Sequence, residues 1–203
     1  MINPFLVTDG DYFALLDHDD VILPNALYEN VKAINETGAQ VLYSDEITLD
    51  GDLKHLIQFH FKIDYAPDFL RGVNYITHFL VFDRKLFEQV GAYEDARFDG
   101  AQDFDLTLRL CEKAKCVYHI PKVLYYWRVH AQSTSGGVDA KPYVTANAIR
   151  ALDDHLARIG VQGKAVEGRF GSTYKIDYAL TSQPLVSIII PNKDQVPVLT
   201  KCI

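Results

Sequence analysis

The sequence predicts an α/β fold built around a mixed, mainly parallel sheet. Tyr12–Leu16 is a short aromatic and aliphatic run without helical spacing, which is typical of a buried strand in a parallel sheet. A helical pattern and a second apolar run, Gln40–Ile47, follow it. Further strand and helix patterns continue to about residue 160. We therefore expect Asp11–Ile47 to form a strand–helix–strand unit whose two strands pair in parallel through a right-handed crossover.

The composition limits the classes of protein to consider. The 203 residues, 48% of them apolar, are enough for one domain or slightly more with a real core. A formal net charge of −7 argues against a nucleic-acid partner, because no basic stripe is present to neutralise phosphates. The three cysteines lack C-x-x-C spacing and indicate neither a disulfide framework nor a zinc site, which favours a reducing, cytoplasmic setting.

The first helix is expected between Pro24 and Gly38. Proline suits the first turn of a helix, and glycine suits the residue that ends one. Leu27, Val31 and Ile34 recur at helical spacing. We therefore expect these three side chains to face the core.

Asp45 and Glu46, near the end of the second strand, are expected to be surface acids. The remaining elements are predicted from local patterns. The expected elements are a turn at Asp50–Asp52, a helix at Pro67–Arg71, a strand at Tyr75–Phe82, a helix capped by Asp83 and ended by Gly91, a helix opening at Ala101, strands at Val117–Ile120 and Val123–His130, a helix at Tyr143–Ile159, a hairpin of Lys164–Phe170 and Tyr174–Leu180, and a strand at Leu185–Ile190.

Three carboxylates crowd together directly after the first strand. Asp17, Asp19 and Asp20 lie within four residues, so they repel one another unless a cation is shared among them. Mg²⁺ and Mn²⁺ prefer oxygen ligands and keep positions open for substrate phosphates. Ligands of open α/β sheets bind beyond the carboxyl ends of the strands, where these acids lie. The alternative is a solvated acidic loop that caps the next helix.

Four segments resemble family 2 glycosyltransferases, in an order that matches this family except for the last one. Leu15–Asp20 resembles the D-x-D signature of the family. Gly91–Tyr93, ahead of Gly100–Leu106, is similar to the block G-x-(F/Y)…(E)-D-x-D-L. Tyr126–Ser133 is similar to the block Y-x-R-x-H-x-x-S, and Pro184–Pro191 resembles the opening strand of the family.

The resemblance implies an incomplete GT-A fold, the three-layer fold of nucleotide-diphospho-sugar transferases. Because the segment that resembles the opening strand comes last, we expect the C-terminal part of one transferase domain in residues 1–160. A hairpin and linker would occupy 161–183, and a second domain would start in 184–203. Leu185–Ile190 is expected to lie beside Tyr12–Leu16, within one chain or by strand exchange in a homodimer.

The resemblance also implies an activity. The family transfers a sugar from a nucleoside-diphosphate sugar, with a UDP-sugar expected first, to a saccharide or lipid-linked acceptor, usually with inversion. We expect this work at the cytoplasmic face of the membrane. Asp17 would lie near the ribose, and Asp19 would ligate Mn²⁺ or Mg²⁺ with His130 as a further ligand. Arg128 would offset the charge of the pyrophosphate, and Asp103 would be the general base.

Three other interpretations of these residues and of the function of the chain stay open. Gln102 stands where the family has a glutamate, which favours a non-catalytic remnant or interaction module. Asp103 and Asp105 lie in the first turn of a helix, where negative charge is stabilising in itself. A metal-dependent phosphohydrolase ranks last, because its nucleophile motif is missing. Trp127 is expected in the core, and six histidines are expected to be structural, namely His18, His55, His60, His78, His119 and His155.

Overall fold

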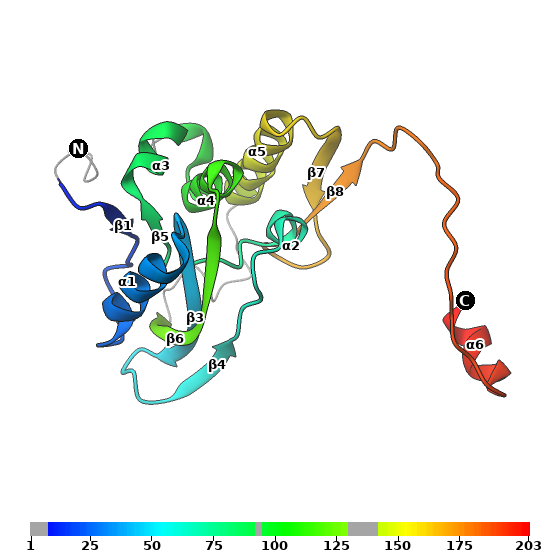
Figure 1. The fold of residues 1–203 in the computed structure, drawn as a ribbon, viewed down its shortest axis with the longest axis horizontal. Coiled ribbons are helices and arrows are strands. Elements are labelled where there is room, and N and C mark those ends of the chain that lie inside the picture. Colours follow the sequence, from blue (N-terminus) through cyan, green and yellow to red (C-terminus); the bar gives the residue numbers. More distant parts are fainter. Residues whose placement is uncertain (1–7, 92–94, 130–141) are drawn as a thin grey trace.

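The structure is a computed structural model that describes residues 8–91, 95–129 and 142–203 (Figure 1). Its strands are β1 (Tyr12–Ala14), β2 (Val21–Ile22), β3 (Val41–Asp50), β4 (Leu56–His60), β5 (Val81–Asp83), β6 (Val117–Val129), β7 (Gly163–Glu167) and β8 (Tyr174–Tyr178). Its helices are α1 (Ala26–Thr37), α2 (Pro67–Gly72), α3 (Arg84–Val90), the 3-10 turn η2 (Ala96–Phe98), α4 (Gln102–Lys113), α5 (Pro142–Arg158) and α6 (Val196–Cys202).

The main sheet is mixed, as predicted, but it is not mainly parallel. Its strand order is β1-β5-β3-β6-β2, with β4 paired to β3, and among the described residues only the β3–β6 ladder is parallel. The expected parallel pair of β1 and β3 is wrong, because β5 lies between them and runs antiparallel to both. Strand order depends on pairing across the chain, which the local pattern of Asp11–Ile47 does not contain.

Helices cover both faces of this sheet, so the fold has three layers (Figure 1). Val41 and Tyr43 of β3 pack into a core with α3, α4 and α5. Leu42, between them, points to the other face and packs with Ala26 and Ala33 of α1. This alternation is the two-residue period of a strand with both faces covered.

The inward face of α1 differs from the predicted one. Ala26, Asn30 and Ala33 are buried against the sheet, whereas Leu27 and Val31 are 62% and 56% exposed. Ile34, the third predicted residue, is partly buried and packs against the core, as predicted. The small alanines let the helix approach the sheet closely, and this turns the larger side chains outward. The predicted end of the helix is confirmed, because Gly38 adopts φ 67° and its N–H donates to the Ile34 carbonyl at 2.8 Å.

Several local predictions are confirmed. Asp83 caps α3, with its Oδ1 accepting from the Leu86 N–H at 2.7 Å. The helices α2, α4 and α5 and the β7–β8 hairpin form where the patterns place them. The two strands expected in 117–130 are one long strand, β6, and the strand expected at Tyr75–Phe82 is reduced to β5. The patterns missed the short strands β2 and β4.

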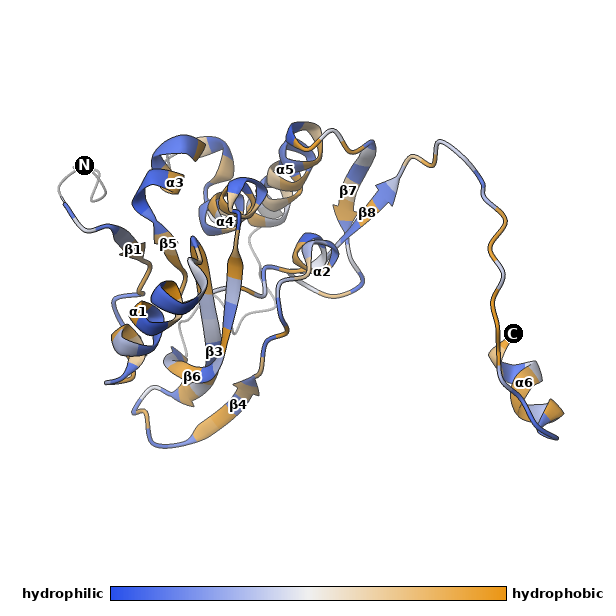
Figure 2. Ribbon diagram, in the orientation of Figure 1, coloured by the Kyte–Doolittle hydropathy of each residue, from blue (hydrophilic) through white to orange (hydrophobic). Residues whose placement is uncertain are grey.

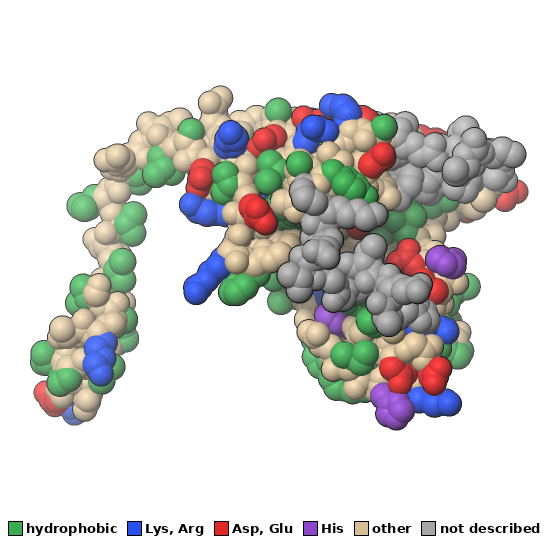
Figure 3. All heavy atoms as spheres, turned by 180° about the vertical axis from the view of Figure 1, so that it is seen from behind, with side chains coloured by type: hydrophobic (Ala, Val, Ile, Leu, Met, Phe, Trp, Pro, Cys, Tyr) green, Lys and Arg blue, Asp and Glu red, His purple; other side chains and the backbone are tan. Residues whose placement is uncertain are grey.

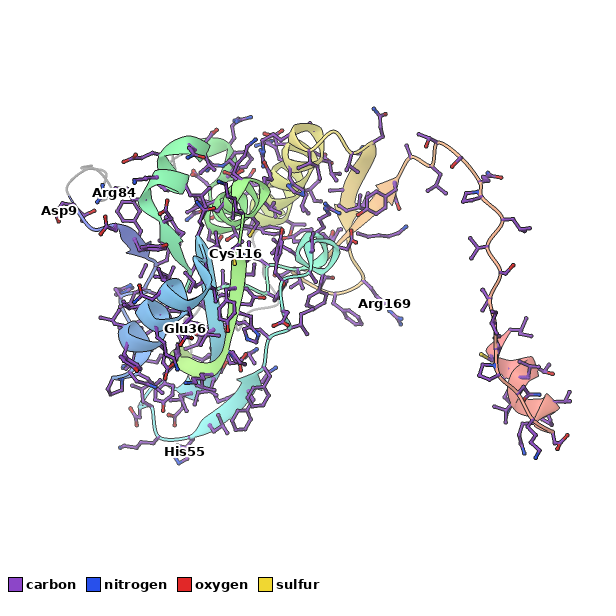
Figure 4. All side chains as sticks on the ribbon, viewed as in Figure 1. Asp9, Glu36, His55, Arg84, Cys116 and Arg169 are labelled. Atoms are coloured by element: carbon purple, nitrogen blue, oxygen red, sulfur yellow. The ribbon has the colours of Figure 1, made fainter. Side chains whose placement is uncertain are left out.

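The sheet ends at β1, which is tied down by α3. Arg84, beside the N-terminal stretch in Figure 4, donates from its side chain to the carbonyls of Thr8 and Gly10, both at 2.5 Å. β1 pairs with β5 on one side, and among the described strands nothing pairs with its other side. β1 is therefore the edge strand of the sheet in the part of the chain that the structure describes.

The C-terminal tail contradicts the predicted docking within one chain. Leu185–Ile190 is not a strand, and Leu185 is 98% exposed. Figure 1 shows this segment leading away from the sheet on the side opposite β1, toward α6. A strand needs a hydrogen-bonded neighbour, and this segment has none among the described residues. Strand exchange with a second chain and the predicted domain boundaries remain predictions.

None of the described helices has the length and apolar character needed to cross a membrane.

Candidate active site

A cavity of about 510 Å³ lies where the loop after β1 meets the N-terminus of α4. Asp17 lines it from the loop, and Gln102 and Asp103 line it from the helix. His78 and Thr77, from the segment before β5, complete its polar wall. Two of the predicted site residues, Asp17 and Asp103, therefore share one cavity although they are far apart in the sequence.

Asp103 is held in place from two sides. The Asn74 amide donates from Nδ2 to Asp103 Oδ2 at 3.1 Å, and the backbone N–H groups of Asp103 and Phe104 also donate to the carboxylate. Burial raises the pKa of Asp103 above its ordinary value, although these backbone amides oppose the rise. The carboxylate thus stabilises the N-terminus of α4 and also faces the cavity, and a raised pKa is suited to accepting a proton.

Two neutral polar groups lie beside Asp103. Gln102 Oε1 and Thr107 Oγ1 are buried and lack a hydrogen-bond partner in the part of the chain that the structure describes. Both residues line the cavity. Asp105 has a different task, because its Oδ2 accepts from Arg109 Nε at 2.9 Å and from Arg109 Nη2 at 2.8 Å one turn along the helix.

The acidic loop is a tight turn anchored to β6. The Asp20 N–H donates to the Asp17 carbonyl at 3.1 Å. The Asp20 carboxylate accepts from the Tyr125 hydroxyl and, at 2.7 Å, from the Arg128 backbone N–H. Burial raises the pKa of Asp20, and these two hydrogen bonds counteract only part of the rise. Asp20 therefore fixes the turn, in which Asp17 is the first residue and the partly exposed Asp19 lies at the tip.

Arg128 contacts the acidic turn through its backbone. Its side chain is directed elsewhere, with Nη1 3.4 Å from the Gly51 carbonyl. The predicted ligand His130 lies outside the described residues.

No group of three or more His, Cys, Asp or Glu side chains is arranged for a metal in residues 8–91, 95–129 and 142–203. The turn carries the carboxylates of Asp17 and Asp19. The chemistry of a carboxylate suits Mg²⁺ or Mn²⁺, since Mg²⁺ commonly takes one or two protein carboxylates and completes its shell with water and substrate phosphates.

Sequence reasoning missed the buried ion pair behind the cavity. Glu46, predicted to be a surface acid, is 4% exposed. Its Oε2 accepts from the Lys62 ammonium at 3.0 Å and from the His78 backbone N–H at 2.8 Å, and its Oε1 lies 3.1 Å from His78 Nδ1. His78, predicted to be purely structural, is thereby oriented at the cavity wall. No local pattern reveals this cluster, because its three members come from separate segments.

Asp45 is also buried rather than exposed. Its Oδ1 lies 2.8 Å from His119 Nε2 and accepts from the Lys62 N–H at 2.9 Å. The His119 ring stacks on Tyr43 with centroids 5.0 Å apart. These contacts join β3, β6 and the segment after β4 behind the site, and they agree with the structural role predicted for His119.

Comparisons with known proteins give two relatives at the level of sequence. No protein-family profile matches the chain. The chain is 41% identical over 198 residues to the uncharacterized protein y4gI of Sinorhizobium fredii, covering 95% of this chain and 22% of that protein. It is 36% identical over 192 residues to the O-antigen biosynthesis protein RfbC of Myxococcus xanthus, covering 94% of this chain and 15% of RfbC. The chain thus spans about a fifth of the length of the curated relatives that it matches.

The fold is similar to that of S. aureus TarS 1-349, solved in complex with UDP-GlcNAc. The TM-score is 0.58 with 15% sequence identity, over 75% of this chain and 44% of the TarS chain. This likeness confirms the α/β architecture with its mixed sheet.

Basic and acidic side chains are interspersed on one face of the molecule. On the face shown in Figure 3, lysine and arginine side chains are scattered among acidic ones.

Proposed function

We propose that this chain forms part of a family 2 glycosyltransferase that transfers a sugar from a nucleoside-diphosphate sugar to an acceptor hydroxyl, with inversion. The observation that carries the proposal is the cavity shared by Asp17 and Asp103. One carboxylate lies on a tight turn and the other at a helix N-terminus, and the pKa of the second is raised by burial. Two carboxylates in different environments are suited to different tasks.

Asp103 acts as the general base. It accepts the proton of the acceptor hydroxyl while that oxygen forms a bond to the anomeric carbon. The bond between this carbon and the diphosphate oxygen breaks, and the electron pair leaves with the nucleoside diphosphate. Because the base and the leaving group lie on opposite sides of the sugar, the configuration at the anomeric carbon inverts. Asn74 keeps the carboxylate oriented, through its 3.1 Å contact.

The acidic turn holds the donor. Asp17 lies near the ribose, and Asp19 with His130 would hold Mn²⁺ or Mg²⁺ beside the diphosphate. The bound ion would supply Lewis-acid stabilisation of the leaving group. Asp20 fixes the turn on β6 through the Tyr125 hydroxyl and the Arg128 backbone N–H.

The comparisons support this proposal in two ways. A relative that matches nearly the whole chain is named for O-antigen biosynthesis, which indicates work on a polysaccharide. A structure of similar fold was solved with UDP-GlcNAc, which favours a UDP-sugar as the donor. Because the chain covers 15% of RfbC, the proposed sugar transfer is assigned to the whole protein and not to this chain alone. We propose that the transfer takes place at the cytoplasmic face of the membrane.

Calorimetric titration of the 203-residue chain with UDP in the presence of Mn²⁺ tests the donor half of the proposal. We expect binding that Asp17→Asn and Asp19→Asn weaken at least tenfold. Asp177→Asn, which removes a half-exposed acid paired with Lys175 on the β7–β8 hairpin, should leave binding unchanged. If the wild-type chain gives no heat with UDP, or if the acidic-turn variants bind as well as the control, the proposal fails.

The second candidate is an interaction module without chemistry. The exposed apolar face of α1, with Leu27 and Val31, favours it, since apolar side chains gathered on a surface mark contact sites.

A further inference from the structure

A second cavity, of about 630 Å³, lies next to the acidic one. Thr77 and His78 line both cavities, so they form a shared wall. Asn74 lines the second cavity and donates to Asp103, which lines the first. Any molecule in the second cavity is therefore one side chain away from the proposed base.

Aromatic rings make up much of the second cavity, and several of them are exposed. Phe59 and Phe61 are 53% and 70% exposed, and their rings stack with centroids 5.3 Å apart and an angle of 13°. Trp127, predicted to be core, lies on the same cavity with its ring centroid 4.4 Å from that of His78. Figure 2 shows the hydrophobic stretch of β4 at the edge of the molecule. Aromatic rings left exposed around a cavity indicate a binding surface.

Polar groups stand among these rings. Asn74 Oδ1 is buried and lacks a partner among the described residues, while Nδ2 of the same amide serves Asp103. His60 and Ser172 also line the cavity. The His60 Nε2 atom lies 2.8 Å from Thr48 Oγ1, which orients the ring, and burial lowers the pKa of His60.

We propose that the aromatic cavity binds the saccharide acceptor, with a sugar ring lying against Phe59 and Phe61. Pyranose rings present C–H faces that pack on aromatic rings, and hydroxyls that need polar partners around the rim. A saturated alkyl chain would leave Asn74 Oδ1 unsatisfied, which costs free energy in a buried place. The inference rests on the proposed function, because it assigns the acceptor of the same reaction.

Trp127 gives a direct readout, since it is the single tryptophan of the chain. The 203-residue chain is applied to an array of bacterial surface saccharides that also carries alkyl lipids. The affinity of a saccharide hit is then measured by Trp127 fluorescence. We expect saccharide binding that Phe59→Ala and Phe61→Ala each weaken about tenfold, the loss of roughly one stacked ring. Both side chains are more than half exposed, so the variants should fold, and circular dichroism checks this.

Tyr28→Ala is the matched control, because Tyr28 is an exposed aromatic on α1, away from the cavity lining. It should bind the saccharide like the wild type. The inference is overturned if no saccharide binds, if the two phenylalanine variants bind like Tyr28→Ala, or if alkyl lipids or UDP alone change the fluorescence in place of saccharides. UDP calorimetry on the same protein separates the two proposals: UDP binding without saccharide binding refutes only this inference, and saccharide binding without UDP binding refutes only the proposed donor site.

Discussion

The buried Glu46–Lys62 ion pair allows a direct test of how much a charge interaction next to the site contributes to the stability of the fold. Their side chains are 5% and 6% exposed, with Lys62 Nζ 3.0 Å from Glu46 Oε2. Burial alone would raise the pKa of Glu46, but the His78 contacts and the Lys62 charge outweigh it and hold this pKa at about 2, against an ordinary value of 4.5. A pKa lower by about 2.5 corresponds to about 3 kcal/mol at about 1.4 kcal/mol per unit.

Glu46→Gln removes the charge and leaves the Lys62 ammonium buried without its counter-ion. We expect the free energy of unfolding at pH 7 to fall by about 3 kcal/mol, within the range of about 3–5 kcal/mol for breaking a buried pair. A depressed carboxyl pKa stabilises the fold above the unfolded-state pKa and loses this effect as the pH falls. The difference between wild type and variant should therefore shrink as the pH falls from 4.5 toward 2.

Equilibrium urea unfolding followed by Trp127 fluorescence measures these free energies, since Trp127 contacts His78. The double variant Glu46→Gln/Lys62→Met should recover most of the loss, because it leaves no unpaired charge. Glu36→Gln is the control, since Glu36 on α1 (labelled in Figure 4) forms an exposed pair with Lys32 at 3.9 Å and its replacement should change stability by less than about 0.5 kcal/mol. A loss below about 1 kcal/mol for Glu46→Gln, or a double variant no more stable than the single one, would refute the reasoning.

Three further predictions concern the base, a helix cap and the tail. Asp103→Asn should abolish sugar transfer by the whole protein, because it removes the base. The variant should resist urea at pH 7 at least as well as the wild type, because a carboxyl whose pKa is raised by burial destabilises the fold when it ionises. The acid limb of the wild-type profile of rate against pH should lie above the ordinary pKa of aspartate. Asp83→Ala should cost about 1 kcal/mol in the same urea assay, because it removes the cap on the Leu86 N–H, and an unchanged midpoint would contradict this. If Leu185–Ile190 pairs with β1 of a second chain, light scattering should show a dimer that Ile188→Lys converts to monomer; a wild-type monomer at high concentration would exclude strand exchange.

The sequence by itself determined most of the local elements and pointed to two acidic residues that line one cavity. Asp83 before an apolar helix, Gly38 after one, and the periodicity of 143–159 carry their meaning within a few residues, so they were predicted correctly. Asp17 and Asp103 were identified through short motifs, and the structure places both on one cavity. The caps, the helical period and the short motifs can be recognised because the residues of each lie within a few positions of one another.

Only the tertiary structure decided the strand order, the inward face of α1 and the partners of Glu46. β5 inserts between β1 and β3, alanines rather than leucine face the sheet, and the Leu185–Ile190 segment has no strand partner among the described residues despite its strong strand propensity. Each of these outcomes depends on which distant segments pack together. Hydrogen bonding between strands, close approach of a helix and the pairing of buried charges are contacts between residues far apart in the chain, and no stretch of sequence contains both partners.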